Sequence, residues 1–444
     1  MTATATPKAG HIDVISMGCS KNLVDSQRLM RMLEVRGYTL SHDPEVPSGE
    51  YVVVNTCGFI GDAKEESISL LLELASLKEE GRIGRIVVMG CLSQRYMDEL
   101  KAEIPEVDEW FGKFDWAAFA TSLPMRREMP AEAPKVWERV LTGNPWSAYI
   151  KISEGCDRFC AFCAIPLITG RHKSRPVEEI LDETRRLVAE GVKEFNVIAQ
   201  DLSSYGLDLY GRHALGELID RMADIEGVEW IRLHYAYPTD FPYDVLPVMA
   251  RRDNVCKYLD IALQHIADPV LERMRRRFGS AQTRGLIERI RREVPGIRLR
   301  TTMMVGFPGE TEENFGELLD FVREARFDRL GAFAYCEEEG TFAERNLTDD
   351  VPEDVKQSRL ERLMEVQEGI ASEIAAGMVG ERVKVIVDRI EGDMAVGRTQ
   401  YDSPEVDPEI YVSFGNRGDM PAPGDMIEAE VTSSDEFDLF ARPC

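Results

Sequence analysis

The sequence of 444 residues contains no apolar run that approaches 18 residues, a length at which a helix can span a membrane. Its first residues, MTATATPKAGHI, lack the apolar core of a signal peptide. No repeat of fixed period and no low-complexity segment is present. These absences predict a cytoplasmic protein without a membrane partner, and in that compartment clustered cysteines hold metal more often than they form disulfides.

Positive charge is scarce in this chain. Its 53 Lys and Arg residues stand against 79 Asp and Glu residues, which gives a formal net charge of −26. An acidic surface repels phosphate, so we expect no stable nucleic-acid binding and favour a basic partner. Solubility alone would explain the acidity equally well.

Strand and helix patterns divide the chain into three predicted domains and a linker. Residues 1–125 alternate short apolar strands with amphipathic helices, which predicts an open parallel βα sheet. Residues 126–147 contain several prolines and are expected to form a linker or an edge hairpin. Residues 148–378 resume the βα alternation, and residues 379–444 contain short strands between Gly, Asp and Pro, which predicts a small antiparallel β-barrel.

Six strand patterns in the central region are too many for the first sheet and too few for a closed eight-fold barrel. We therefore expect an open, partial βα barrel, with the long amphipathic helix in PEDVKQSRLERLMEVQEGIASEIAAG packed back on it. The six stretches are AYIKIS, EFNVIAQD, WIRLHY, YLDIALQ, IRLRTTMMVGF and RLGAFAYC. The C-terminal region has four: ERVKVIVDRI, MAVGRTQ, EIYVSF and DMIEAEVTSS.

Three of the nine cysteines stand together in SEGCDRFCAFCAIP, directly after the first strand of the central region. In this C-x3-C-x2-C spacing, Cys156, Cys160 and Cys163 can wrap around one face of an iron–sulfur cube. The fourth iron would then be open to a substrate or cofactor. Structural zinc is the alternative, but zinc takes four ligands, and neither the distant Cys256 nor His172 in a charged loop is an evident fourth.

This loop resembles that of the radical S-adenosylmethionine (SAM) superfamily, which has an aromatic residue before the last cysteine at the first strand of a partial βα barrel. The resemblance implies that the three cysteines hold a [4Fe-4S] cluster whose open iron chelates SAM. Reductive cleavage of SAM would give a 5′-deoxyadenosyl radical, and Phe162 would lie by the adenine. The stretch MMVGFPGET resembles a later motif near the adenine, with Gly306, Gly309 and Glu310 as its fixed points. By itself, G-x-x-G-E usually marks only a turn before a helix.

Cys19, Cys57 and Cys91 each end a predicted strand, 38 and 34 residues apart, which is about one βα unit. The carboxyl ends of parallel strands share one edge of a sheet, so these cysteines should converge. We expect the small residues beside them to leave room for something bulky: Gly18, Gly58 and Gly90. Three matching positions favour a second metal cluster over three cysteines that pack as small hydrophobes.

Two clusters in this order closely resemble the methylthiotransferases, which combine a three-cysteine N-terminal domain, a radical SAM core and a C-terminal barrel of the TRAM type. The resemblance covers essentially the whole chain and is carried by GCSKNLVDSQ, VNTCGFI, GCLSQRY, ISEGCDRFCAFCAIP, HKSRP, IALQHI, TTMMVGFPGETEENF and EEEGTFA. Two residues depart from the family pattern, Ala262 where Pro is usual and Cys336 where Ser is usual, and neither is an expected ligand.

The resemblance is strongest to the branch that methylthiolates the β-carbon of an aspartate in ribosomal protein S-twelve of the small subunit. It implies two [4Fe-4S] clusters, SAM, a low-potential electron donor and a sulfur donor. Two rival functions stay open at this point. One is a tRNA methylthiotransferase that acts on the adenosine beside the anticodon, and the other is a non-catalytic iron–sulfur or zinc-binding module.

The charge of the C-terminal region favours a protein substrate over tRNA. From Glu381 onwards, 6 Lys and Arg stand against 15 Asp and Glu, so the region nets 6 − 15 = −9. A tRNA-binding barrel would be expected to display a basic face, because phosphate contacts dominate such affinity. An acidic barrel instead attracts a surface rich in Lys and Arg, which ribosomal proteins offer.

Several further residues are candidates for lesser roles. Gln200 and Asp201 end the strand EFNVIAQD and are candidates for contact with SAM or substrate. His234 and His265 lie at strand ends and are candidates for the cavity wall. Two of the remaining cysteines are predicted to be packing residues and the third is a terminal thiol: Cys256, Cys336 and Cys444.

Overall fold

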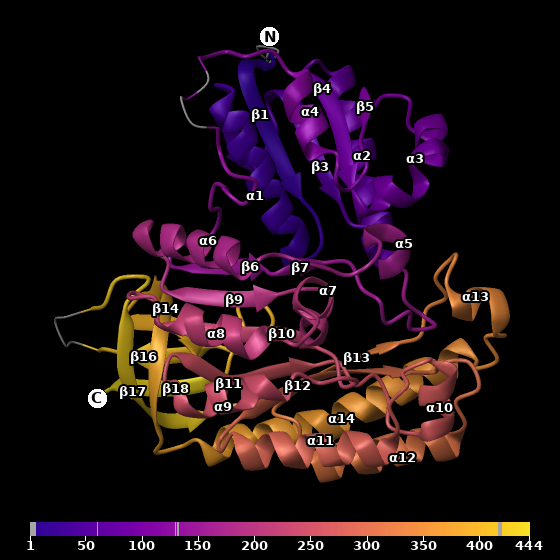
Figure 1. Cartoon of the computed structure of the whole chain (residues 1–444), viewed down its shortest axis with the longest axis vertical. Helices are drawn as coiled ribbons and strands as arrows, with labels where there is room; N and C mark the ends of the chain where they lie inside the picture. Colours follow the sequence, from indigo (N-terminus) through magenta and orange to yellow (C-terminus); the bar gives the residue numbers. More distant parts are fainter. Residues whose placement is uncertain (1–5, 60, 129, 131–132, 416–419) are drawn as a thin grey trace. The chain divides into compact units, whose positions relative to one another are not determined.

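The computed structural model describes residues 6–59, 61–128, 130, 133–415 and 420–444 (Figure 1). Contacts divide the chain into two units. The first comprises Met1–Gly143 and the short segment Ala164–Arg171, and the second comprises Asn144–Cys163 and His172–Cys444. None of the helices in these described ranges is long and apolar enough to cross a lipid bilayer.

The first unit is built on a parallel sheet with the strand order β2-β1-β3-β4-β5. Alternate residues of the central strands face opposite cores, with Val53 and Val87 on one side and Val54 and Val88 on the other. This is the open βα sheet that the sequence predicted. Its elements are β1 (Lys8–Ser16), α1 (Ser20–Val35), β2 (Thr39–His42), β3 (Gly49–Thr56), α2 (Gly61–Glu79), β4 (Arg85–Gly90), α3 (Cys91–Glu103), β5 (Glu109–Trp110), α4 (Trp116–Ser122) and α5 (Ile165–Thr169).

The core of the second unit is a six-stranded parallel sheet with the order β13-β12-β11-β10-β9-β6. Its two edges, β13 and β6, make it the open, partial barrel that was predicted. The long helix α14 packs against β13 and α12, as expected (Figure 1). The strands are β6 (Ser147–Lys151), β7 (Ser153–Glu154), β8 (Lys173–Ser174), β9 (Glu194–Ile198), β10 (Trp230–Ala236), β11 (Val255–Ile261), β12 (Arg298–Val305) and β13 (Arg329–Ala334). The helices are α6 (Val177–Ala189), η1 (Leu202–Ser204), α7 (Leu207–Tyr210), α8 (Leu215–Ala223), η2 (Tyr243–Val245), α9 (Leu246–Arg251), α10 (Asp268–Arg273), α11 (Ser280–Glu293), α12 (Glu312–Ala325), α13 (Phe342–Asn346) and α14 (Glu353–Gly377).

The C-terminal strands close a barrel with the order β14-β15-β16-β18-β17. The strands are β14 (Arg382–Glu391), β15 (Met394–Thr399), β16 (Ile410–Ser413), β17 (Met426–Ser434) and β18 (Leu439–Pro443). The fifth strand, LFARP, was not predicted, because its three apolar residues are consecutive and do not alternate with polar ones. It inserts between β16 and β17 and pairs with β16 in parallel, which corrects the expectation of a wholly antiparallel barrel.

Buried ion pairs attach this barrel to the amino-terminal ends of the six-stranded sheet. Glu194, the first residue of β9, accepts hydrogen bonds from Arg232 of β10 and from both terminal nitrogens of Arg398 of β15, the latter at 2.8 Å. Two further pairs join the starts of β12 and β13 to the barrel: Arg300–Asp407 and Arg329–Asp402. The opposite, carboxyl ends of the strands, where ligands bind in parallel βα folds, are left to the cysteine loop.

Candidate functional site

The first candidate site is the loop 156–163, which follows β6 and β7 and carries the three clustered cysteines. Their side chains are partly buried. The backbone of Ala161 fixes the loop between two distant segments, because its N–H donates to Met274 O at 2.9 Å and its carbonyl accepts from Ala343 N at 2.8 Å. The thiols are therefore presented by a braced loop and not by a free one.

Arg158 ties this loop to the segment after β9. Its Nε donates to Asp201 Oδ2 at 2.7 Å and its Nη2 donates to Ser204 Oγ at 3.1 Å. Asp201 also accepts from Ser203 N at 2.8 Å and from Ser204 Oγ at 2.6 Å. Both oxygens of Asp201 thus bind protein donors, and this carboxylate holds the cysteine loop in place.

Gln200 has a different environment from its neighbour Asp201. Its Nε2 donates to Glu154 Oε1 at 2.6 Å, and the other oxygen of Glu154 lies 2.6 Å from Lys151 Nζ. Within the described part of the chain, the buried Oε1 of Gln200 has no hydrogen-bond partner. Because an unsatisfied buried acceptor is costly, this oxygen is a candidate contact for a bound ligand.

Phe162 packs against the loop that follows β12. Its ring centroid lies 6.3 Å from that of Phe307, which in turn lies 5.1 Å from Tyr335, and both pairs meet edge to face. Phe307 belongs to the stretch MMVGFPGET. The structure thus brings two predicted motifs together at the carboxyl ends of the sheet.

The glycines of MMVGFPGET allow that loop to turn under neighbouring side chains. Gly306 and Gly309 have left-handed φ angles of 71° and 81°. A Cβ on Gly306 would lie 2.3 Å from Lys356 Cγ, and one on Gly309 would lie 1.4 Å from Arg273 Nη1. Any other residue at either position would collide with these side chains or force them to move.

Glu310 closes the same loop from the inside. Its Oε2 accepts from Gly306 N at 2.5 Å and its Oε1 lies 3.3 Å from Arg359 Nη1. Burial raises the pKa of Glu310 to about 7, although Arg359 opposes the shift. His265, with Nε2 3.9 Å from Glu310 Oε2, is fully buried, and burial together with Arg359 lowers the pKa of His265 to about 3. The side chain of His265 is therefore neutral near pH 7.

The second candidate site lies at the carboxyl edge of the sheet in the first unit. The neighbouring strands β1, β3 and β4 lead directly into the segments that carry Cys19, Cys57 and Cys91. Cys19 precedes α1, whereas Cys91 is the first residue of α3. The thiols affect one another electrostatically, since Cys19 and Cys57 both oppose ionisation of Cys91.

The glycines beside these cysteines serve close packing between the loops. A Cβ on Gly18 would lie 2.8 Å from Cys57 Sγ, and one on Gly58 would lie 2.8 Å from the carbonyl carbon of Cys91. A Cβ on Gly90 would lie 2.5 Å from the carbonyl oxygen of Thr56, the last residue of β3. The expectation that these glycines leave room for something bulky is therefore wrong, because neighbouring chain fills the space.

Lys113 is a buried cation of this site that the sequence pattern did not indicate. Its Nζ donates to Asp25 Oδ2 at 3.0 Å and to Asn22 Oδ1 at 3.2 Å. Cys91 Sγ donates to the same oxygen of Asn22 at 3.7 Å. In the sequence this lysine stands between Phe111 and Phe114, and that local pattern does not indicate a position beside a cysteine site.

Charge distinguishes the three thiols of the second site. Desolvation raises the pKa of Cys19, but Lys21, Lys113 and nearby backbone N–H groups outweigh it, so that the pKa of Cys19 is lowered overall. Burial raises the pKa of Cys57, and it raises the pKa of Cys91 to about 11 against the opposing effect of Lys113. Cys19 is therefore the most readily ionised of the three.

The donors of both sites suit iron–sulfur clusters, which use soft thiolate ligands. Across the described ranges, no three His, Cys, Asp or Glu side chains are close enough together to hold one metal ion. The thiolates of a cube bind different irons, so they stand farther apart than the ligands of a single ion. Three converging thiols in each site, with the orphaned oxygen of Gln200 beside the first, fit this chemistry.

The other candidate residues lie in ordinary structural environments. Cys256 is fully buried against Trp230 and Tyr258, as a packing residue should be. Cys336 is exposed in the loop after β13, so its predicted packing role is wrong. His234 is buried, with Nε2 3.3 Å from Asn196 Oδ1, and Cys444 is exposed as predicted for a terminal thiol.

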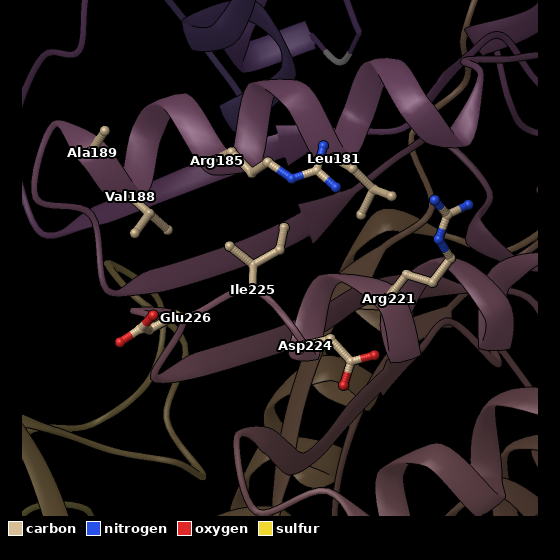
Figure 2. Close-up of a pocket in the computed structure, with 8 residues that line it drawn as sticks. All are labelled: Leu181, Arg185, Val188, Ala189, Arg221, Asp224, Ile225 and Glu226. Carbon is tan, nitrogen blue, oxygen red and sulfur yellow. The ribbon is translucent and has the colours of Figure 1, made fainter.

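A pocket of about 510 Å³ opens between α6 and the end of α8 (Figure 2). Leu181, Val188 and Ile225 are among its apolar lining residues, and Arg185 and Arg221 line it as well. The pocket lies on the helical face of the sheet, and the predicted site residues are not among those that line it.

Three family profiles match the chain in order. The uncharacterized protein family UPF0004 matches residues 11–112, the radical SAM superfamily matches residues 150–322, and the TRAM domain matches residues 379–444. Membership of the radical SAM superfamily implies a [4Fe-4S] cluster and SAM. The radical SAM methyltransferase TsrM from Kitasatospora setae, with tryptophan substrate and a SAM analog bound, has a similar fold. Its TM-score is 0.53 at 15% identity, over 86% of this chain and 79% of that chain.

Relatives of nearly the same length are much more similar. The ribosomal protein uS12 methylthiotransferase RimO of Bacteroides thetaiotaomicron is 57% identical over 441 residues, which cover 98% of each chain. The protein of the same name from Porphyromonas gingivalis is 58% identical over 98% of this chain and 99% of its own. That from Christiangramia forsetii is 45% identical over 99% of this chain and 96% of its own. The chain therefore belongs to the RimO family of ribosomal protein uS12 methylthiotransferases.

Proposed function

We propose that this chain inserts a methylthio group at the β-carbon of an aspartate in ribosomal protein uS12 of the small subunit. The observation that carries the proposal is its 55% to 58% identity, over at least 97% of its length, to proteins named ribosomal protein uS12 methylthiotransferase. A protein ligand on the C-terminal barrel agrees with the acidity of that region.

Two [4Fe-4S] clusters are part of the proposal, one held by Cys156, Cys160 and Cys163 and one held by Cys19, Cys57 and Cys91. When bound, the first cluster and SAM supply a radical that abstracts hydrogen, and the second cluster and a further SAM supply the methylated sulfur. The aspartate β-C–H bond requires a radical, because no side-chain base removes the hydrogen of this bond as a hydrogen atom.

The chain's own residues position these reagents. Arg158 and Asp201 hold the first cysteine loop through a 2.7 Å hydrogen bond. Phe162 would contact the adenine, and Gln200 Oε1 is the acceptor that we assign to bound SAM, because it has no partner in the described protein. The loop with Gly306, Gly309 and Glu310 lies beside Phe162, because Phe307 of this loop packs against the Phe162 ring.

The C-terminal barrel is the proposed docking surface for uS12. Tyr411 and Phe440 stack on its outside with centroids 5.6 Å apart, and Phe440 and Phe437 are exposed. Aromatic faces among carboxylates suit lysine and arginine side chains. Its exposed acidic residues are Glu381, Glu391, Asp393, Glu405, Asp425, Glu428, Asp435 and Glu436.

Recognition and chemistry are separated in this arrangement. The barrel covers the starts of strands whose other ends carry the first cysteine loop, and an eight-residue strand such as β12 spans roughly 25 Å. The substrate aspartate must therefore lie on a segment that extends from the docked body of uS12. We further propose a low-potential electron donor for SAM cleavage and a sulfur donor for the methylthio group. A cytoplasmic location is also proposed, because the substrate is a ribosomal protein.

Mass spectrometry of cells that lack this chain tests the function. We expect uS12 to lose the mass of one methylthio group on an aspartate, with restoration by the wild-type gene and none by the Cys160→Ala variant. Loss of the methylthio group from tRNA, with uS12 unchanged, would transfer the assignment to the tRNA enzyme.

Pull-downs with the full chain test the docking surface. We expect uS12 to bind, and binding to weaken as salt rises, because exposed charges are screened. Glu428→Lys and Glu436→Lys should weaken binding. The matched control is Glu324→Lys, an exposed residue on α12, outside the barrel. Retention of tRNA without retention of uS12 would contradict the proposal.

A further inference from the structure

Arg276, just after α10, is a buried arginine that faces a cysteine and not a carboxylate. It is 3% exposed, and its Nη1 donates to Cys160 Sγ at 3.4 Å. Its Nη2 donates to the carbonyl oxygen of Ala262. Among the described residues, no carboxylate lies within ion-pair distance of Arg276. By contrast, the buried Arg232 and Arg398 both pair with Glu194.

Burial of a guanidinium without an anion is costly, so the structure calls for a negative partner at this point. The guanidinium of Arg276 instead contacts Cys160 Sγ at 3.4 Å and lies 4.1 Å from the ring centroid of Tyr237. Cysteines that ligate a cluster are thiolates, and their negative charge would serve as the counter-charge of Arg276 in place of a carboxylate. The side chain is thus arranged for the loaded site.

Tyr237 belongs to the same group. Its hydroxyl oxygen lies 3.4 Å from Cys160 Sγ and 3.4 Å from the carbonyl oxygen of Arg276. The guanidinium carbons of Arg276 and Arg158 lie 4.1 Å and 4.5 Å from its ring centroid, which fixes the ring. The hydroxyl has one hydrogen, which it can donate either to this carbonyl or to the sulfur of a cysteine that ligates iron.

We infer that Arg276, assisted by Tyr237, is a positioning residue that raises the reduction potential of the cluster on Cys156, Cys160 and Cys163. Reduction adds one electron to the cluster, and a fixed cation with two hydrogen-bond donors at a ligand sulfur stabilises the added negative charge. The inference rests on the proposed assignment of that cluster. Its consequence is a site that accepts the electron for SAM cleavage from a weaker donor than the bare ligand set would need.

Potentiometric titration followed by electron paramagnetic resonance tests the inference. The parent protein is the full chain with Cys19→Ala, Cys57→Ala and Cys91→Ala, reconstituted anaerobically, so that a single cluster gives the signal. In this parent, Arg276→Gln should shift the midpoint potential to a more negative value, and Tyr237→Phe should shift it less in the same direction. Arg277→Gln, which removes the charge of the adjacent exposed arginine, is the matched control and should leave the potential unchanged.

Arg276→Lys keeps the charge but loses the planar fork of donors, so its potential should lie between those of the parent and Arg276→Gln. An unchanged midpoint in Arg276→Gln at equal iron content would overturn the inference. Should Arg276→Gln hold no iron, unchanged midpoints in both Arg276→Lys and Tyr237→Phe would overturn it. A parent without any cluster signal would overturn the cluster assignment as well, whereas a signal with unaltered potentials would refute this inference alone.

Discussion

Replacement of Glu194 with alanine would remove the anion that joins the core sheet to the C-terminal barrel. The side chain is fully buried and accepts from Arg398 twice at 2.8 Å, from Ser147 Oγ at 2.7 Å and from Arg232. In the variant Arg398 keeps a second partner, Asp388, with Nε 2.7 Å from its carboxylate. Among the described residues, Arg232 keeps only neutral acceptors, one of which is the carbonyl oxygen of Thr399 in the barrel at 3.1 Å.

Loss of one partner from a buried ion pair costs about 3 to 5 kcal/mol, because an uncompensated charge remains. We expect about 3 kcal/mol here, the lower end of that range, because Arg398 remains paired. Burial raises the pKa of Glu194, but Arg398 and Arg232 outweigh it and hold that pKa well below its usual range. The stabilisation is therefore fully present above the unfolded-state pKa of roughly 4.3 and is lost as the pH falls toward the lower folded-state value.

Urea unfolding at neutral pH, followed by tryptophan fluorescence, measures this cost. Trp146 and Trp230 report on the contact, since Trp146 Nε1 lies 3.3 Å from Asp388 and Trp230 packs in a cluster with the barrel residue Ile386. The matched control is Glu229→Ala, which removes an exposed pair across the same contact, 2.8 Å from Lys384. The control should cost at most about 1 kcal/mol. A Glu194→Ala variant that loses no more than the control would refute this reasoning.

Three further predictions concern the cysteines. Cys160→Ala should abolish reductive SAM cleavage, because a methyl group cannot ligate iron; release of 5′-deoxyadenosine by the reconstituted variant would show that the radical site is elsewhere. Cys57→Ala should retain SAM cleavage but stop sulfur insertion, with iron falling from about eight to about four per chain; unchanged iron would return the second site to simple packing. In the apoprotein, Cys19 should be alkylated by iodoacetamide at lower pH than Cys57 or Cys91, because its pKa is lowered and theirs are raised. Peptide mass mapping across pH measures this order, and equal pH profiles for the three thiols would contradict it.

The sequence predicted the open parallel sheet and the partial barrel, because period-two and helical patterns report local burial. It did not indicate β18, whose position depends on pairing with β16 and β17. The interpretation of the glycines beside Cys19, Cys57 and Cys91 as open space was wrong. A glycine in a sequence can indicate either an open space or a close approach of two chain segments. Only the positions of the neighbouring loops distinguish the two.

The sequence by itself determined which cysteines are candidate ligands. Cys156, Cys160 and Cys163 share one loop, so their proximity follows from chain length, and Cys19, Cys57 and Cys91 recur at the spacing of a βα unit. Tertiary structure alone decided what surrounds them. Arg276 reaches Cys160 across 116 residues and Lys113 reaches Asn22 across 91. Such contacts depend on how distant loops pack at the end of a sheet, and no local pattern encodes that packing.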